Sequence, residues 1–177
     1  QMIARDLRIL LGAADAEDVP FLVGTAGGSG SREHVDRFMD VFRRVVDDEG
    51  FEFTVAKIYT DVEHSYVAEK LRAGDVVGLG LGDGLDEATI DRTERMVAQV
   101  GVSPFVEALE RGADVVVGGR SSDLSPFAAL PLREGFDPGL TYHLGKILEC
   151  GARATTAASG NDCLVGVLRD DHFEVVP

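Results

Sequence analysis

Phe21-Leu-Val-Gly-Thr-Ala-Gly-Gly-Ser-Gly30 joins a short apolar run to a turn with four glycines, and a helical pattern follows directly. Residues 31–50 place their apolar side chains at intervals of three and four, which is typical of an amphipathic helix. A buried strand, a glycine turn and an amphipathic helix in succession are characteristic of sheets with parallel strands. The stretch therefore predicts an α/β fold.

The alternation of strands and helices extends along the rest of the chain. Apolar runs predict strands, and three-to-four-residue periodicity predicts helices. Gly12 is placed to end the first helix, and the glycine-rich connection at residues 74–84 is typical of a mobile loop. The predicted strands span residues 19–23, 53–59 and 114–118, and the predicted helices span residues 2–11, 67–71, 86–100 and 104–111.

Two further helices carry start signals. Ser125-Pro126 and Asp137-Pro138 each place a capping side chain before a proline, which suits the first turn of a helix. We expect these helices to span residues 125–133 and 138–150, with Gly151 as the stop of the second.

The strand patterns predict the fold class. The earlier runs are apolar without alternation, which indicates strands covered on both faces. Residues 164–168 and 173–176 predict an antiparallel hairpin or two short strands. We therefore expect an α/β fold with a mostly parallel sheet and helices on both faces. It is Rossmann-like without a standard dinucleotide fingerprint, and a small antiparallel element lies at its C-terminal end.

Composition limits the function classes. With 177 residues, 45% of them apolar, the chain suits one core, and we expect a single α/β domain over residues 1–177. The net charge of -14 repels nucleic acid and anionic membranes. No apolar run approaches the ~20 residues that span a bilayer, and no signal peptide is visible, so we expect a cytoplasmic protein with no membrane partner. The helical pattern at residues 2–11 begins without a cap, so we expect a segment of a longer chain.

The residues that could bind a metal are few. Cys150 and Cys163 lack zinc-ligand spacing, and we expect two buried thiols. Asp83, Asp86 and Glu87 could approach a metal, but acidic residues at a helix start also stabilise the helix dipole. We predict no metal site.

The glycine turn allows two interpretations. Bare backbone N–H groups at the start of a helix favour an anion, which makes Gly27, Gly28, Ser29 and Gly30 candidate substrate-binding residues. A tight turn that packs closely would also need glycines. The spacing fits neither G-x-G-x-x-G nor a P-loop, so the sequence predicts no NAD and gives no motif support for ATP.

A second polar loop follows the predicted strand at residues 114–118. Open α/β sheets bind ligands at the carboxyl ends of their strands. Arg120 suits a carboxylate or phosphate, Ser121 and Ser122 could donate hydrogen bonds, and Asp123 could act as a base. Alternatively, Asp123 forms an ion pair with Arg120 that holds the loop. If the strands at 19–23 and 114–118 are neighbours, both loops face one crevice.

Two residues on helices complete the candidate catalytic set of His34, Asp123 and Lys146. His34 lies in the first turn of the 31–50 helix, above the glycine turn, where a general acid or base role is one interpretation. Lys146 lies beside His143 and Cys150 at the margin of an apolar stripe. A half-buried histidine without a catalytic role is the common alternative at such a margin.

Four strings taken together resemble the acyclic terpene utilisation family, the AtuA-like proteins once filed as a domain of unknown function. They are GTAGGSGSREHVD, GADVVVGGRSSD, REGFDPGL and HLGKILECGA, and the likeness covers most of residues 2–177. The resemblance implies an N-terminal α/β domain in a chain of several hundred residues. It also implies a further glycine- and aspartate-containing strand and loop upstream. The recurrent loop residues of the family correspond to Gly27, Gly28, His34, Arg120, Asp123 and Lys146.

The family context gives a metabolic setting, because its genes often lie beside genes for the breakdown of branched terpenoid acids as CoA thioesters. Our leading hypothesis is an enzyme of branched-chain or terpenoid carboxylic acid or acyl-CoA catabolism, of lyase, hydratase or isomerase type. CoA would enter only as part of a small anionic substrate, and we expect a homo-oligomer or a companion domain. The alternative is a non-catalytic ligand-binding or assembly subunit, and nucleotide binding comes third.

Overall fold

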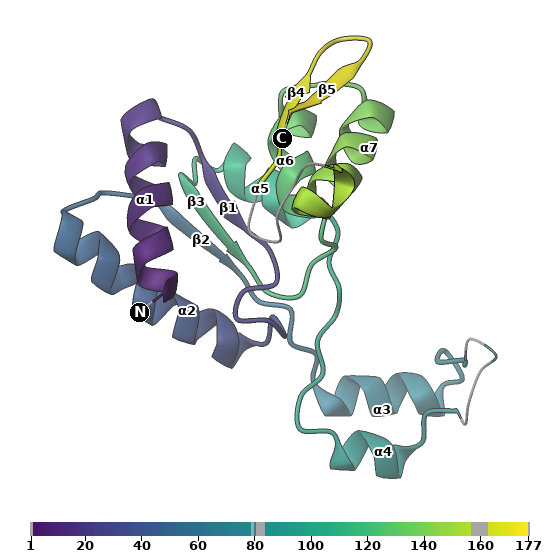
Figure 1. Ribbon diagram of the computed structural model, residues 1–177. Helices are drawn as coiled ribbons and strands as arrows, with labels where there is room; N and C mark the ends of the chain where they lie inside the picture. Colours follow the sequence, from purple (N-terminus) through teal and green to yellow (C-terminus); the bar gives the residue numbers. More distant parts are fainter. Residues whose placement is uncertain (1, 79, 81–83, 157–162, 177) are drawn as a thin grey trace.

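A parallel sheet of three strands organises the structure (Figure 1). Its order is β1 (Phe21–Val23), β3 (Val115–Gly118) and β2 (Val55–Ile58), so β3 lies in the middle. Val116 of β3 is in register with Leu22 on one side and Ala56 on the other. The structure, a computed structural model, describes residues 2–78, 80, 84–156 and 163–176.

The helices α1 (Met2–Glu17) and α2 (Arg32–Glu49) pack on one face of this sheet. Successive side chains of a strand point to opposite faces, so β3 sends two of its valines to this side. The buried residues of this core include Leu7, Leu11, Val35, Met39, Phe42, Val45, Val115 and Val117.

The opposite face is covered by α5 (Ser103–Glu110) and α6 (Ser125–Arg133). Val116 points to this side, and its buried partners are Phe105, Ala108, Leu109, Ala113 and Ala129. The run of three valines is therefore apolar throughout because β3 is covered on both faces, which confirms the predicted fold class.

The C-terminal part of the chain adds one helix and a smaller antiparallel sheet. The helix α7 (Pro138–Leu148) packs on α6, and a short 3-10 turn, η1 (Gly151–Ala154), follows it. The strands β4 (Val165–Leu168) and β5 (Phe173–Val176) then form the predicted hairpin. This hairpin contacts α7 through β4.

An arm leaves the sheet between β2 and α5 (Figure 1). It contains α3 (His64–Arg72) and α4 (Glu87–Arg92), which pack on each other. At its root the outgoing and returning chains pair in antiparallel fashion: Val62 N–H donates to the Met96 carbonyl at 2.9 Å, and Ala98 N–H donates to the Thr60 carbonyl at 2.8 Å. Residues 79 and 81–83 of the expected glycine-rich loop, Asp83 among them, lie outside the described residues.

The prediction that Gly12 ends the first helix is wrong. The helix continues to Glu17, because the next residues are mostly alanines, which favour helix, and Ala14 is buried. The chain leaves the helix at Asp18, whose φ of 52° is left-handed. Aspartate tolerates that conformation better than most residues, so Asp18, and not Gly12, is the left-handed residue that follows the helix.

The predicted helix over residues 86–100 is also wrong beyond Arg92. Thr93 is already extended, with ψ at 123°. The following residues lead back to the sheet and give their backbone hydrogen bonds to other segments: Val100 N–H donates to the Arg120 carbonyl at 3.1 Å. The helical spacing of apolar residues does not produce a helix here, because the backbone groups of these residues form hydrogen bonds with distant segments.

Smaller differences concern helix ends and cysteines. Asp137 caps α7 as predicted, because its Oδ1 accepts from Leu140 N–H at 2.8 Å. Ser125 does not cap α6: it lies inside the helix, fully buried. Both Cys150 and Cys163 are exposed, contrary to the expected buried thiols. The first three strands are shorter than predicted, α3 is longer, and α7 ends at Leu148.

Within the described ranges, no helix has the length and apolarity that crossing a membrane requires.

Phe105 tests the core on the α5 side. Its side chain is 0% exposed, so Phe105→Ala should lower the free energy of unfolding by about 3–5 kcal/mol. Phe127→Ala on the adjacent α6 is the matched control, because Phe127 is 44% exposed and should cost about 1 kcal/mol. Urea denaturation of both variants measures the difference. Equal losses would contradict the assignment of Phe105 to the core.

Candidate functional site

The carboxyl ends of all three parallel strands lie at one edge of the sheet (Figure 1). The loop at residues 24–31 follows β1, the residues from Tyr59 to Asp61 follow β2, and the loop at residues 119–123 follows β3. Because β1 and β3 pair directly, the two loops that the sequence singled out are neighbours. This edge is where open α/β sheets bind ligands.

Backbone hydrogen bonds connect the three loops. Thr25 N–H donates to the Gly119 carbonyl at 2.9 Å. The Arg120 N–H is shared between Thr60 Oγ1, at 2.8 Å, and the Gly30 carbonyl oxygen, at 3.2 Å. Thr60 is 4% exposed, and its Oγ1 lies 3.4 Å from the same Gly30 oxygen. The side chain of Thr60 therefore holds the ends of β1, β2 and β3 together.

Most glycines of the first loop have a packing role. A Cβ on Gly30 would lie 2.2 Å from the Arg120 nitrogen, and a Cβ on Gly27 would lie 2.6 Å from His34 Cβ. Both residues also have left-handed φ angles, of 73° and 69°. The tight-turn interpretation therefore explains these two glycines.

Gly28 is different. Its φ is 94°, but nothing lies within 4 Å of the position that a Cβ would take. Gly27, Gly28 and Ser29 are exposed, whereas Gly30 is buried. The exposed Gly28 and Ser29 therefore lie between two packed glycines. Their backbone N–H groups donate to the Thr25 carbonyl at 3.2 Å and to His34 Nδ1 at 3.4 Å.

His34 lies in the first turn of α2, beside the exposed Ser29 of the loop. Its Nδ1 is 2.7 Å from Ser29 Oγ and 3.4 Å from the Ser29 backbone nitrogen. Ser29 Oγ also accepts from Ser31 N–H at 3.2 Å. The structure therefore joins the predicted binding residue Ser29 to the predicted catalytic residue His34.

The second loop carries two charged side chains, Arg120 and Asp123. Among the described residues, neither the Arg120 guanidinium nor the Asp123 carboxylate makes a hydrogen bond or an ion pair. The alternative in which these two residues hold the loop by pairing with each other is therefore not what the structure has. Arg120 is half-buried and Asp123 is exposed.

The two serines of this loop are less accessible. Ser121 is fully buried, and its Oγ has no hydrogen-bond partner in the part of the chain that is described. Ser122 is half-buried, and its backbone N–H donates to the Val100 carbonyl at 2.8 Å. Ser122 is thus the more accessible of the two side chains.

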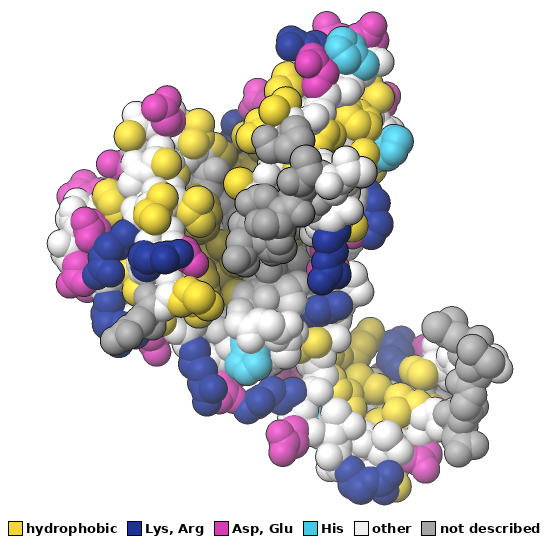
Figure 2. Space-filling model, viewed as in Figure 1, with side chains coloured by type: hydrophobic (Ala, Val, Ile, Leu, Met, Phe, Trp, Pro, Cys, Tyr) yellow, Lys and Arg dark blue, Asp and Glu magenta, His cyan; other side chains and the backbone are white. Residues whose placement is uncertain are grey.

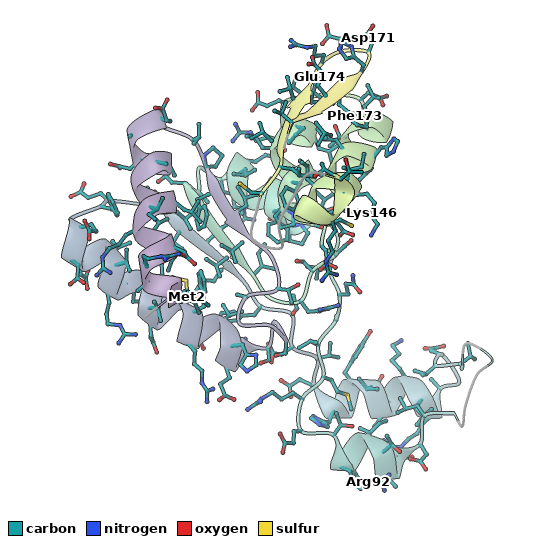
Figure 3. The ribbon with its side chains drawn as sticks, in the orientation of Figure 1. Met2, Arg92, Lys146, Asp171, Phe173 and Glu174 are labelled. Carbon is teal, nitrogen blue, oxygen red and sulfur yellow. The ribbon has the colours of Figure 1, made fainter. Side chains whose placement is uncertain are left out.

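Lys146, labelled in Figure 3, comes from α7. It is exposed and forms an ion pair with Glu149. The hydrogen bond and charge of Glu149 raise the pKa of Lys146, and Asp123 acts in the same direction. A raised pKa keeps the ammonium protonated at neutral pH, and its ion-pair partner is Glu149.

The sequence interpretation missed the residues after β2. Asp61 Oδ2 accepts from Arg32 N–H at 2.8 Å, next to the glycine loop. The Arg32 guanidinium lies 3.8 Å above the Tyr59 ring, and Arg95 of the returning arm pairs with Glu33. Figure 2 shows basic, acidic and histidine side chains gathered where α2 begins and the arm departs. Polar residues directly after a parallel strand were the available signal.

No group of three or more His, Cys, Asp or Glu side chains that could hold a metal ion occurs among the described residues.

The family comparison agrees with the four sequence strings. The family described as acyclic terpene utilisation family protein AtuA matches residues 2–162. No curated protein and no solved structure matches the chain.

The contact of Gly30 with Arg120 can be tested against a glycine of the same backbone conformation. Gly30 and Gly50 have φ angles of 73° and 74°, but nothing lies within 4 Å of a Cβ on Gly50. Gly50→Ala should cost only the left-handed strain, about 1–2 kcal/mol. Gly30→Ala should cost a further ~1–3 kcal/mol, because the loops must separate. Urea denaturation compares the two variants, and equal costs would contradict close loop packing.

Proposed function

Because the chain belongs to the acyclic terpene utilisation family, we propose that it acts in the catabolism of branched-chain or terpenoid carboxylic acids or their CoA thioesters. The family is implicated in acyclic terpene utilisation, which is consistent with a catabolic role. The proposed activity is a lyase, hydratase or isomerase step on an anionic substrate.

One observation carries this proposal: the Arg120 guanidinium, which has no hydrogen-bond or ion-pair partner among the described residues, belongs to the loop that packs against the glycine turn. Arg120 N–H donates to the Gly30 carbonyl at 3.2 Å, so the backbones of the two loops are in contact. The N-terminus of the 18-residue helix α2 adds the positive end of its dipole to the same edge. The positive end of a helix dipole and an arginine with no side-chain partner among the described residues together suit a carboxylate or a phosphate.

The proposed roles follow from this placement. Gly27, Gly28, Ser29 and Gly30 supply the backbone of the anion site, and Arg120, Ser121 and Ser122 line its other side. His34 or Asp123 moves a proton. Lys146 provides a positive charge near Asp123. Ser121 would need a local rearrangement to reach a substrate, because it is fully buried.

The remaining parts of the proposal concern cofactors and partners. CoA enters as part of the substrate, and the mechanism demands neither NAD nor a metal. We propose a cytoplasmic protein that works as a homo-oligomer or beside a companion domain.

A non-catalytic ligand-binding or assembly subunit is the second candidate function, and one observation favours it. Met2, Ile3, Ile9 and Leu10 of α1 are 48–73% exposed. A patch of this kind on one helix suits contact with another protein surface.

Ligand screening by thermal shift separates the two candidates. An acyl-CoA at 100 times its Kd should add ~2.7 kcal/mol to the stability of the full-length protein. Arg120→Ala should abolish that shift, because the guanidinium would no longer contact the anionic group. Arg44→Ala is the control: Arg44 is an exposed arginine on α2, away from the two loops, and its replacement should leave the shift unchanged.

Two results would speak against the enzyme. A stabilising effect that Arg120→Ala leaves intact would move the ligand away from the proposed site. Stabilisation by a partner protein alone, with no response to acyl-CoAs, small dicarboxylates or nucleotides, would favour the subunit.

A further inference from the structure

The hydrogen bonds around His34 decide which ring nitrogen faces a ligand. Nδ1 lies 3.4 Å from the backbone nitrogen of Ser29 and 2.7 Å from its Oγ. A backbone N–H can only donate, so Nδ1 accepts and carries no proton in the neutral ring. The single ring proton of neutral His34 is then on Nε2.

The hydroxyl of Ser29 is fixed by the same network. Its Oγ accepts from Ser31 N–H at 3.2 Å and lies 3.1 Å from Ser31 Oγ. If the Ser29 hydroxyl donates to Nδ1, the hydrogen between the two hydroxyl oxygens comes from Ser31. Ser31 is fully buried at the start of α2, so Ser29 is anchored to a rigid element.

The opposite side of the imidazole is free. Within the described part of the chain, Nε2 of His34 has no hydrogen-bond partner. Gly27 packs against the base of the side chain, where a Cβ would lie 2.6 Å from His34 Cβ. The ring is therefore held at Cβ and at Nδ1, while Nε2–H can donate to a substrate. In this form Nε2 cannot accept a proton.

We propose that Ser29 is a positioning residue that fixes His34 as the Nε2–H tautomer, so that His34 donates a hydrogen bond to a substrate oxygen and does not serve as the base. The inference rests on the proposed function and deepens it.

In this role the Nε2–H of His34 stabilises the negative charge that develops on a substrate oxygen and keeps its own proton.

Long-range proton–nitrogen NMR correlation on the full-length protein tests the tautomer without any substrate. The wild type should show His34 as the Nε2–H form, with no detectable Nδ1–H form. Ser29→Ala should make the Nδ1–H form of His34 detectable, and Ser29→Thr, which keeps the hydroxyl, should restore the wild-type pattern. Ser65→Ala, at an exposed serine of α3, is the matched control and should change nothing.

Three outcomes would overturn the inference. The first is a predominant Nδ1–H form in the wild type. The second is a Ser29→Ala spectrum identical to that of the wild type. The third is covalent labelling of Ser29 by a fluorophosphonate probe, detected as added mass, because Ser29 would then be a nucleophile.

The tautomer result is independent of the thermal-shift screen. A fixed Nε2–H form in a protein that no acyl-CoA stabilises would support the role of Ser29 while removing the proposed substrate. If an acyl-CoA stabilises the protein but His34 is not fixed as the Nε2–H tautomer, the proposed substrate would be supported and the role of Ser29 would be removed.

Discussion

The shared hydrogen bond at the Arg120 backbone nitrogen is the interaction on which the site depends. Thr60 Oγ1 and the Gly30 carbonyl oxygen both accept from it, at 2.8 and 3.2 Å, so one N–H ties together the loops that follow three strands. A side chain at position 30 would meet the Arg120 nitrogen at 2.2 Å, so only glycine allows this contact without a shift of the backbone. The order of the strands brings the loops together, and this hydrogen bond sets their spacing.

Packing and exposure divide the glycine loop into two functions. Gly30 and Gly27 serve packing, because their neighbours leave no room for a Cβ. Gly28 and Ser29 are exposed, and Ser29 contacts the ring of His34. The two interpretations of the glycine turn therefore do not compete, because Gly27 and Gly30 fix the exposed Gly28 and Ser29 between them. In the proposed site an anion would meet these exposed residues and the Arg120 guanidinium, which has no partner among the described residues.

Local signals predicted the fold well where the chain follows its own propensities. The valines of β3, the apolar stripe of α2 and the Asp137 cap lie as expected, because each depends on short-range pattern or on burial. The prediction of a helix over residues 86–100 failed because the backbone of its second half forms hydrogen bonds with distant residues. The role of Thr60 could not be predicted from the sequence, because it also depends on contacts between distant residues. A single threonine after a strand has no distinctive spacing, and its role appears only when three loops meet.

Hydrogen exchange of the full-length protein with and without an acyl-CoA tests the central claim, that the loops after β1 and β3 form one anion site. We predict slower amide exchange in peptides covering residues 25–34 and in peptides covering residues 118–123, both at the same ligand concentration, because one ligand contacts both loops. Protection of only one loop, or protection confined to the arm with α3 and α4, would contradict a shared site.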